Sequence, residues 1–315
     1  MGQTDATTKD SRSLPALRVT LGSILLAALK GAGAASTGSA ALLASAIDSA
    51  GDALVSAGNW LVVRAADQPA DREHPFGHGK LEHLAGLGQG LIIGTSGVLV
   101  IREAVVRFGT TADLGRPLVG LGVTLFSLGA AWGFARYLKT QAKRHDSPAL
   151  EADSLHYATD LFTHVGVLVV FASNLLFGSS PWLDPAVGVI IGAMILHGAW
   201  GLLIESGHRL MDAELEREEL GVVEEVFRSF GPPVRGFHDL LTRRSGPDRF
   251  IQAHVEIDAD VSFREAHEVI DRIESMIRAR LPRAQIILHA DPWPEDPGDP
   301  HQPHARASHR ADGET

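Results

Sequence analysis

The chain has 315 residues, of which 45% are apolar, a formal net charge of −10 and no cysteine. The lack of cysteine excludes disulfides and thiolate ligands, so any metal site must use histidine and carboxylate. There is no basic patch, which argues against a nucleic-acid partner.

Charge divides the chain into two unlike parts. Residues 212–315 hold 22 acidic and 13 basic residues, net −9, whereas residues 1–211 hold 16 and 15, net −1. We therefore expect an apolar domain at 14–211 and a soluble acidic domain at 212–293. Residues 1–13 are polar and lack a secretory signal, and residues 294–315 are rich in proline, histidine and aspartate, so both are predicted to be disordered tails.

Six apolar stretches in the first two thirds of the chain have the length of a membrane-spanning helix. They cover residues 15–35, 39–64, 84–107, 117–138, 155–177 and 186–207. Glycine and alanine are abundant in them, as in helices that pack closely in lipid. The sequence thus predicts an all-α bundle of six helices in a lipid bilayer.

Basic residues between these stretches predict the orientation of the bundle. They gather before the first stretch, after the second and after the fourth, whereas the first and fifth connections hold none. Because lysine and arginine accumulate on the cytoplasmic side, both termini are predicted to be cytoplasmic. Lys30 lies inside the first stretch, and the sequence leaves open whether it extends to the interface or pairs with a carboxylate.

The second stretch carries two carboxylates, Asp48 and Asp52. Residues four apart share one helix face. A charge at membrane depth costs at least about 2.5–3.5 kcal/mol, so two of them need compensation. A bound divalent cation would supply it; a hydrated vestibule or basic partners are the alternatives.

The fifth stretch repeats this spacing with His156 and Asp160. Two helices that each present such a pair can converge on one ion, as in metal sites inside helical bundles. Three carboxylates and one imidazole would form a four-coordinate shell that suits Zn²⁺ and is tolerable for other first-row divalent ions. An isolated histidine in a span, by contrast, more often makes an interhelical hydrogen bond.

Between the second and third stretches, Asp71, His74 and His78 could close on one small cation. A polar turn with solvated histidines explains the same residues, and spacing does not decide between the two interpretations.

Beyond Arg209 the pattern becomes that of a small α+β domain. Helices are predicted at 214–230 and 262–281, and strands at 234–243, 249–257 and 284–289, in the order α-β-β-α-β. Five residues there are candidate metal ligands, although surface histidines are common by chance: His238, His254, His267, His289 and Asp291.

Several motifs, in order, resemble those of the cation diffusion facilitators, most closely the bacterial zinc and iron efflux members. The resemblance runs from about residue 15 to 293 and rests on Asp48-Ser49-Ala50-Gly51-Asp52, His74-Pro75-Phe76-Gly77-His78-Gly79-Lys80, His156-Tyr157-Ala158-Thr159-Asp160, His238-Asp239-Leu240, Arg249-Phe250-Ile251-Gln252-Ala253-His254 and His289-Ala290-Asp291-Pro292.

The resemblance implies a homodimer of six-helix transporters in the inner (plasma) membrane, each with a cytoplasmic, metallochaperone-like domain. It implies efflux of a divalent metal in exchange for protons, and no enzymatic activity. The carboxylate and imidazole set favours Zn²⁺ and Cd²⁺, while Fe²⁺, Mn²⁺ and Co²⁺ can use similar ligands. Its transport site would comprise Asp48, Asp52, His156 and Asp160. Because imidazole titrates nearest to physiological pH, His156 is the candidate proton carrier, and Asp52 is expected to share protons with it.

The same resemblance assigns Asp71, His74 and His78 to a loop site and the five C-terminal candidates to a two-metal centre at the dimer interface. Lys80 and Asp212 match a salt bridge between the membrane and cytoplasmic parts. Pro75 stands where relatives often have serine, and the long histidine-rich loop of eukaryotic members is absent.

Two other functions are open to such a chain. A membrane-anchored metal sensor or assembly protein would bind without transport, but all four transport ligands are present here. An intramembrane metallohydrolase would need a catalytic base and an open coordination position, and the sequence has no His-Glu-x-x-His motif.

Overall fold

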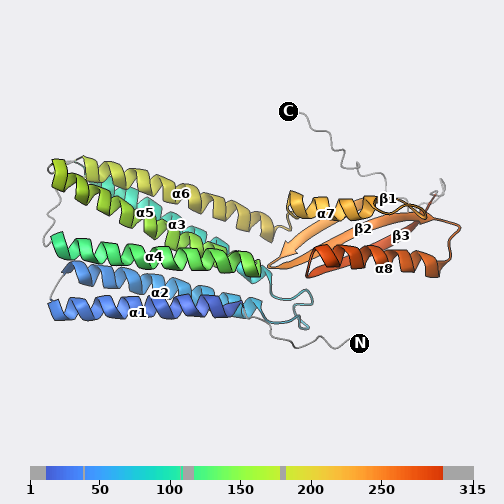
Figure 1. Cartoon of the computed structure of the whole chain (residues 1–315), viewed down its shortest axis with the longest axis horizontal. Helices are drawn as coiled ribbons and strands as arrows, with labels where there is room; N and C mark the ends of the chain where they lie inside the picture. The colour runs from blue at the N-terminus through green and yellow to red at the C-terminus, as the bar shows by residue number, and fades with distance from the viewer. Residues whose placement is uncertain (1–11, 38–39, 107, 109–116, 178–181, 294–315) are drawn as a thin grey trace. The chain divides into compact units, whose positions relative to one another are not determined.

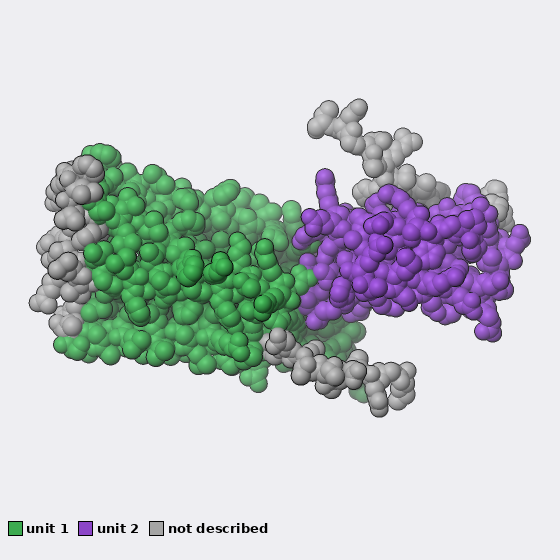
Figure 2. All heavy atoms as spheres, viewed as in Figure 1, with its two compact units in different colours: residues 1–210 green, residues 211–315 purple. Residues whose placement is uncertain are grey.

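The computed structural model describes residues 12–37, 40–106, 108, 117–177 and 182–293. The chain forms two compact units, residues 1–210 and 211–315, which Figure 2 colours separately. The predicted tails fall almost wholly outside the described residues. Arg12 and Ser13, however, belong to the first unit, because Arg12 is buried and Ser13 begins the first helix.

Six helices of 25 to 30 residues make up the described part of the first unit, and Figure 1 shows them running lengthwise beside one another. They are α1 (Ser13–Thr37), α2 (Ala40–Ala66), α3 (Lys80–Val106), α4 (Pro117–His145), α5 (Pro148–Phe177) and α6 (Leu183–Leu210). The closest pairs are α1 with α2, α3 with α6 and α4 with α5.

Three of these helices, within Ser13–Ser36, Lys80–Val106 and Pro185–Leu210, are long and apolar enough to cross a membrane. The helices α2 and α5 are as long, but they carry Asp48, Asp52, Asp153 and Asp160. The first unit is thus a helical membrane domain, and the count of six spans stays a prediction.

The helices α4 and α5 both extend beyond the apolar stretches that predicted them. The sequence placed their facing ends at residues 138 and 155, whereas α4 ends at His145 and α5 begins at Pro148. Asp146 makes the turn with φ of 54°, a left-handed conformation that aspartate tolerates. Burial of Ser147 and Leu150 holds this polar segment against the bundle.

The second unit is an α+β domain, and it has the predicted element order. It comprises α7 (Arg217–Arg228), β1 (Val234–Ser245), β2 (Asp248–Asp258), α8 (Phe263–Arg280) and β3 (Ala284–Trp293). The strand β2 is central, antiparallel to β1 and parallel to β3. The helices α7 and α8 contact each other and share one apolar core with the sheet (Figure 1). Among the described residues of this unit, no helix covers the other face of the sheet.

Candidate functional site

Helices α2 and α5 bring three of the four predicted transport ligands together. Asp52, His156 and Asp160 each offer a ligand atom, and these atoms lie within 4.8 Å of one another. His156 Nε2 is 3.4 Å from Asp52 Oδ1 and 4.0 Å from Asp160 Oδ2. We call these three residues the membrane cluster.

Asp48, the fourth predicted ligand, is not part of that group. It lies one turn before Asp52 on α2, and its side chain is exposed in the described structure. Its carboxylate therefore neighbours the membrane cluster along the helix without closing on it, and its role as a ligand stays a prediction.

Two atoms of the membrane cluster are buried and lack a hydrogen-bond partner among the described residues. They are His156 Nε2 and Asp160 Oδ2. An unsatisfied buried polar atom costs about 1–3 kcal/mol, and a natural protein keeps one only for a reason. A cation between these two atoms and Asp52 would satisfy all three, so the donor set fits a divalent metal.

A buried polar network, which the sequence pattern did not reveal, borders the membrane cluster. Asp153, one turn before His156, is fully buried and accepts hydrogen bonds from Ser56 Oγ and Gln89 Nε2, each at 3.3 Å. The hydroxyl of Tyr157 lies 2.9 Å from Ser56 Oγ and 2.5 Å from Ser23 Oγ. Helices α1, α2, α3 and α5 are thereby fixed around the cluster.

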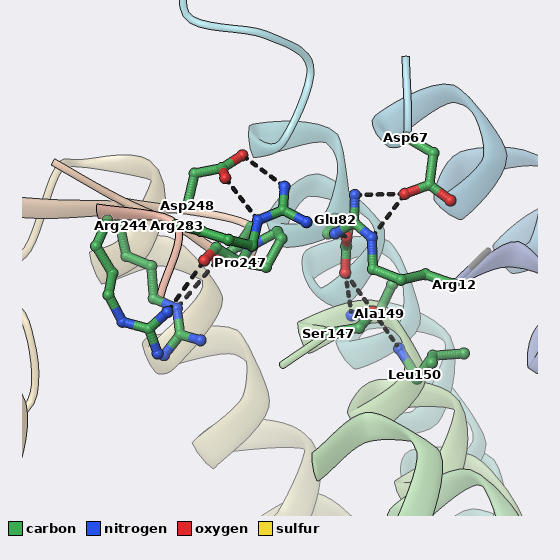
Figure 3. Close-up of polar contacts among 12 residues, drawn as sticks. Arg12, Asp67, Glu82, Ser147, Ala149, Leu150, Arg244, Pro247, Asp248 and Arg283 are labelled. Carbon is green, nitrogen blue, oxygen red and sulfur yellow. Dashed lines mark hydrogen bonds and ion pairs between the residues drawn. The ribbon is translucent and has the colours of Figure 1, made fainter. Parts of the chain in front are cut away.

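A second buried network ties α1, α2 and α3 to the α4–α5 turn (Figure 3). Arg12 pairs with Glu82 at 2.5 Å and with Asp67 at 2.5 Å. Glu82 is fully buried and also accepts hydrogen bonds from Ser147 Oγ and the backbone N–H of Ala149. The sequence gives no signal for these contacts, since the partners are up to 70 residues apart.

The loop between α2 and α3 gathers Asp71, His74 and His78, whose ligand atoms also lie within 4.8 Å of one another. We call these three residues the loop cluster. Asp71 Oδ1 is 3.3 Å from His74 Nδ1, and Asp71 Oδ2 is 3.5 Å from His78 Nε2. Gly77 allows this tight turn, because its φ of 81° is unfavourable for other residues.

Asp71 is held in its ionised form by the loop backbone. Hydrogen bonds from the backbone N–H groups of His74 and Glu73 lower the pKa of the Asp71 carboxyl below its usual value. His78 Nδ1 is buried without a hydrogen-bond partner among the described residues. An anionic oxygen beside two imidazoles is a donor set that a small divalent cation would fit.

The sheet of the second unit places three predicted ligands in one row. His238 pairs with His254 across β1 and β2, and His254 pairs with His289 across β2 and β3. Asp291 follows two positions along β3, so its side chain points to the same face as His289.

The distances show that this row converges on Asp291. Asp291 Oδ2 lies 2.8 Å from His254 Nδ1 and 3.2 Å from His238 Nε2, while Asp291 Oδ1 lies 3.3 Å from His289 Nε2. His238 Nε2 is buried without a hydrogen-bond partner among the described residues. We call these four residues the sheet cluster, and its donor set also fits a divalent metal.

His267, the fifth predicted C-terminal ligand, does not join the sheet cluster of its own chain. It lies on α8 with its side chain 65% exposed, 3.8 Å from Asp271, and stacks on Phe263. The Lys80–Asp212 pair also stays a prediction, because these residues belong to different units. Lys80 contacts the carbonyl of Leu210 at 3.4 Å, and Asp212 contacts Arg243 at 3.3 Å.

Family models cover nearly the whole described chain. The cation efflux transmembrane domain matches residues 16–211, and the cation efflux protein cytoplasmic domain matches residues 215–293. The two matches meet close to the border between the two units.

Several individual proteins are similar to this chain over most of their own length. The cation-efflux pump FieF of Pectobacterium atrosepticum is 40% identical over 81% of this chain and 84% of its own. The FieF of Cronobacter sakazakii is 35% identical over 89% of this chain and 92% of its own. A solved structure of a putative zinc transporter, CzrB, in its zinc form is 30% identical over 26% of this chain and 94% of its own, with a TM-score of 0.24. On the family models and the two FieF relatives, the chain belongs to the cation diffusion facilitator family of cation-efflux proteins.

Proposed function

We propose that this divalent cation efflux protein exports Zn²⁺ in exchange for protons, with the membrane cluster as its transport site. One observation carries the proposal: Asp52, His156 and Asp160 converge within 4.8 Å between two helices of the membrane unit. Asp48, one turn away on α2, would complete the shell when the cargo is bound.

The ligand chemistry supports Zn²⁺ as the first choice. One imidazole and three carboxylates give a nitrogen and oxygen shell that a tetrahedral Zn²⁺ accepts. Cd²⁺, Fe²⁺ and Mn²⁺ can use the same donors, so the choice among them rests on the geometry of the occupied site.

Proton exchange follows from the requirement that metal ligands be deprotonated. Binding of the cation and binding of protons then compete for His156 and Asp52. Imidazole titrates nearest to physiological pH, which makes His156 the main proton carrier. Helices that rock around the cluster would expose it to one side of the membrane at a time.

We further propose that the chain lies in the inner membrane with both termini in the cytoplasm. The excess of lysine and arginine before α1, after α2 and after α4 supports this orientation. Protons that enter from outside would then drive metal outward.

The sheet cluster would act as the cytoplasmic metal sensor of a homodimer. Its four residues already meet within one chain, while His267 lies apart on α8. We propose that His267 contributes when a second copy binds, so that filling the site joins the two acidic domains. The loop cluster would hold one further cation in the loop between α2 and α3.

The alternatives are a membrane-anchored sensor or assembly protein that binds metal without transport, and a transporter mainly for Fe²⁺, Mn²⁺ or Co²⁺. A hydrolase is disfavoured because the membrane cluster would commit its donors to the cargo, which leaves no catalytic base. A measurement of metal flux across a membrane distinguishes these functions, because only a transporter moves the metal.

The test is Zn²⁺ uptake into proteoliposomes under an imposed pH gradient. We expect gradient-driven flux in the wild type, its loss in Asp52→Ala and Asp160→Ala, and a smaller loss in Asp48→Ala. Glu205→Ala is the matched control, because this carboxylate lies on α6 outside the three clusters and its flux should equal that of the wild type.

Zn²⁺ binding without flux in the wild type would contradict the zinc exporter. The same assay with Fe²⁺ and Mn²⁺ then decides between another cargo and a sensor.

A further inference from the structure

Lys30 is buried within the membrane unit and contacts the helix that carries two of the proposed transport ligands. It lies on α1 and is only 4% exposed. Its ammonium group donates a hydrogen bond of 2.7 Å to Ser49 Oγ on α2. Ser49 directly follows Asp48 and precedes Asp52 by three residues, so the ammonium reaches the helix that bears both aspartates.

A buried ammonium ion needs nearby negative charge, because burial of an unpaired charge is very costly. The groups that act on Lys30 electrostatically are Asp48, Asp52 and Asp160. These are all three carboxylates of the proposed transport site. Lys30 makes no hydrogen bond to any of them at ordinary distance, so it contributes charge and does not occupy the ligand atoms.

We propose that Lys30 is a tethered cation of the transport site, which balances the carboxylates when the cargo is absent and weakens metal binding enough to permit release. This inference rests on the proposed function of the membrane cluster. Lys30 is a positioning residue in this scheme and does not ligate the metal.

Charge counting shows why such a residue is useful. Three carboxylates carry −3, and one ammonium brings the total to −2, which one divalent cation neutralises. Without Lys30 the same carboxylates would hold the cation in a site with a surplus negative charge. Charges interact more strongly at the dielectric of a protein interior than in water, so the fixed ammonium is expected to raise the metal Kd by about tenfold or more.

A purely structural role would give a different result. If Lys30 only linked α1 to α2, its loss would loosen the helices that hold Asp48 and Asp52, and metal binding would weaken or stay unchanged. Tighter binding after a substitution is not produced by damage to the fold. The sign of the change in Kd therefore separates the two roles.

The experiment is a Zn²⁺ titration of full-length protein in detergent, in competition with a chelating dye. Wild type and Lys30→Met are each measured with and without Asp52→Ala, so that the difference isolates the transport site from the loop and sheet clusters. We expect Lys30→Met to lower the Kd of this site by about tenfold or more, while Lys30→Arg, which keeps the charge, stays near the wild type. In vesicles, Lys30→Met should lower both KM and maximal flux, because release slows.

Lys30→Gln provides the same test with a hydrogen-bond donor retained toward Ser49, in case Lys30→Met does not fold. Ser49→Ala removes the hydrogen bond but keeps the ammonium, and it should leave the Kd within about threefold. An unchanged or raised Kd in folded Lys30→Met or Lys30→Gln would overturn the inference. If wild type and Asp52→Ala bind Zn²⁺ alike, the proposed transport site itself is wrong, whatever Lys30 does.

Discussion

At the scale of one residue, the buried ion pair of Glu82 with Arg12 is expected to stabilise the membrane unit. The Glu82 carboxylate is fully buried at the start of α3, and Arg12, itself buried, supplies the compensating charge at 2.5 Å. Removing one partner of a buried ion pair is far more costly than replacing both by neutral groups of similar shape. The buried start of α3 is therefore stable only when Arg12, the residue before α1, is held beside Glu82.

Arg12→Met is expected to destabilise the membrane unit, because Glu82 would be left as an unpaired buried charge. The expected loss is about 3–5 kcal/mol in the free energy of unfolding. The measurement is the thermal unfolding temperature of the protein in detergent.

The double variant Arg12→Met/Glu82→Gln should recover most of that loss. Arg18→Met is the matched control, since Arg18 lies on α1 and, among the described residues, makes only an exposed hydrogen bond to Tyr137. A single variant as stable as the control would mean that the pair contributes little.

At the scale of elements, glycine determines how closely α3 and α6 approach. A Cβ atom added to Gly192 would lie 2.5 Å from Ile101 Cγ1 and 3.0 Å from the carbonyl oxygen of Gly97. The second distance is to backbone, which cannot rotate away. Small residues at such contacts allow helices in lipid to pack by their backbones.

Gly192→Ala should therefore push α6 away from α3 and cost about 1–3 kcal/mol, the usual range for overpacking. Gly201→Ala on the same helix is the matched control, because its added Cβ would meet no atom within 4 Å. Unfolding temperatures in detergent compare the two. Equal effects would show that α3 and α6 can separate without loss.

The helix α8 begins with a capping box that responds to pH. Ser262 Oγ accepts a hydrogen bond from the backbone N–H of Glu265, and Glu265 Oε2 accepts one from the backbone N–H of Ser262. Hydrogen bonds from Ser262 lower the pKa of the Glu265 carboxyl below its usual 4.5. The backbone N–H of Ser262 has the larger effect and its hydroxyl the smaller.

Because the folded state binds the Glu265 proton less tightly than the unfolded state, the cap stabilises α8 above pH of about 4.5. This contribution is lost as the pH falls through the lowered pKa. The protection factors of amides in the first turn of α8, which correct the exchange rates for their intrinsic pH dependence, should fall over that window in the wild type. Glu265→Gln should remove the pH dependence, whereas Glu268→Gln, one turn on, should preserve it.

At the scale of the whole molecule, each unit has its own core and its own cluster of metal-binding groups. The second unit packs α7 and α8 on one face of its sheet, and the sheet cluster lies along β1, β2 and β3. A ligand that binds only the folded state stabilises that state by mass action, by about 2.7 kcal/mol at a concentration of 100 Kd. Metal should therefore stabilise the second unit independently of transport.

Zn²⁺ is expected to slow hydrogen exchange in β1, β2 and β3 of the full-length protein, and a chelator should reverse the effect. His254→Ala should abolish it, since His254 is the central residue of the row. Asp52→Ala should leave it intact. If Zn²⁺ slowed hydrogen exchange in His254→Ala as much as in the wild type, the stabilising metal would bind outside the sheet cluster.

Periodicity in the sequence predicted the long helices and the α-β-β-α-β order of the second unit, because 3.6- and 2-residue repeats are local properties. Spacing also paired Asp48 with Asp52 on one helix and His156 with Asp160 on another, since residues four apart on a helix share a face. The row of histidines on the sheet needed strand register as well, which depends on partners far along the chain.

The sequence by itself determined the membrane unit, the acidic domain and the residue types of the three clusters. Only the tertiary structure decided that Asp48 stands outside the membrane cluster, that Asp153 and Glu82 are fully buried, and that Lys30 reaches Ser49. The reason is physical: helical spacing fixes which residues share a face, whereas burial and charge pairing depend on which helices pack together. Those contacts join residues that are 19 to 97 positions apart.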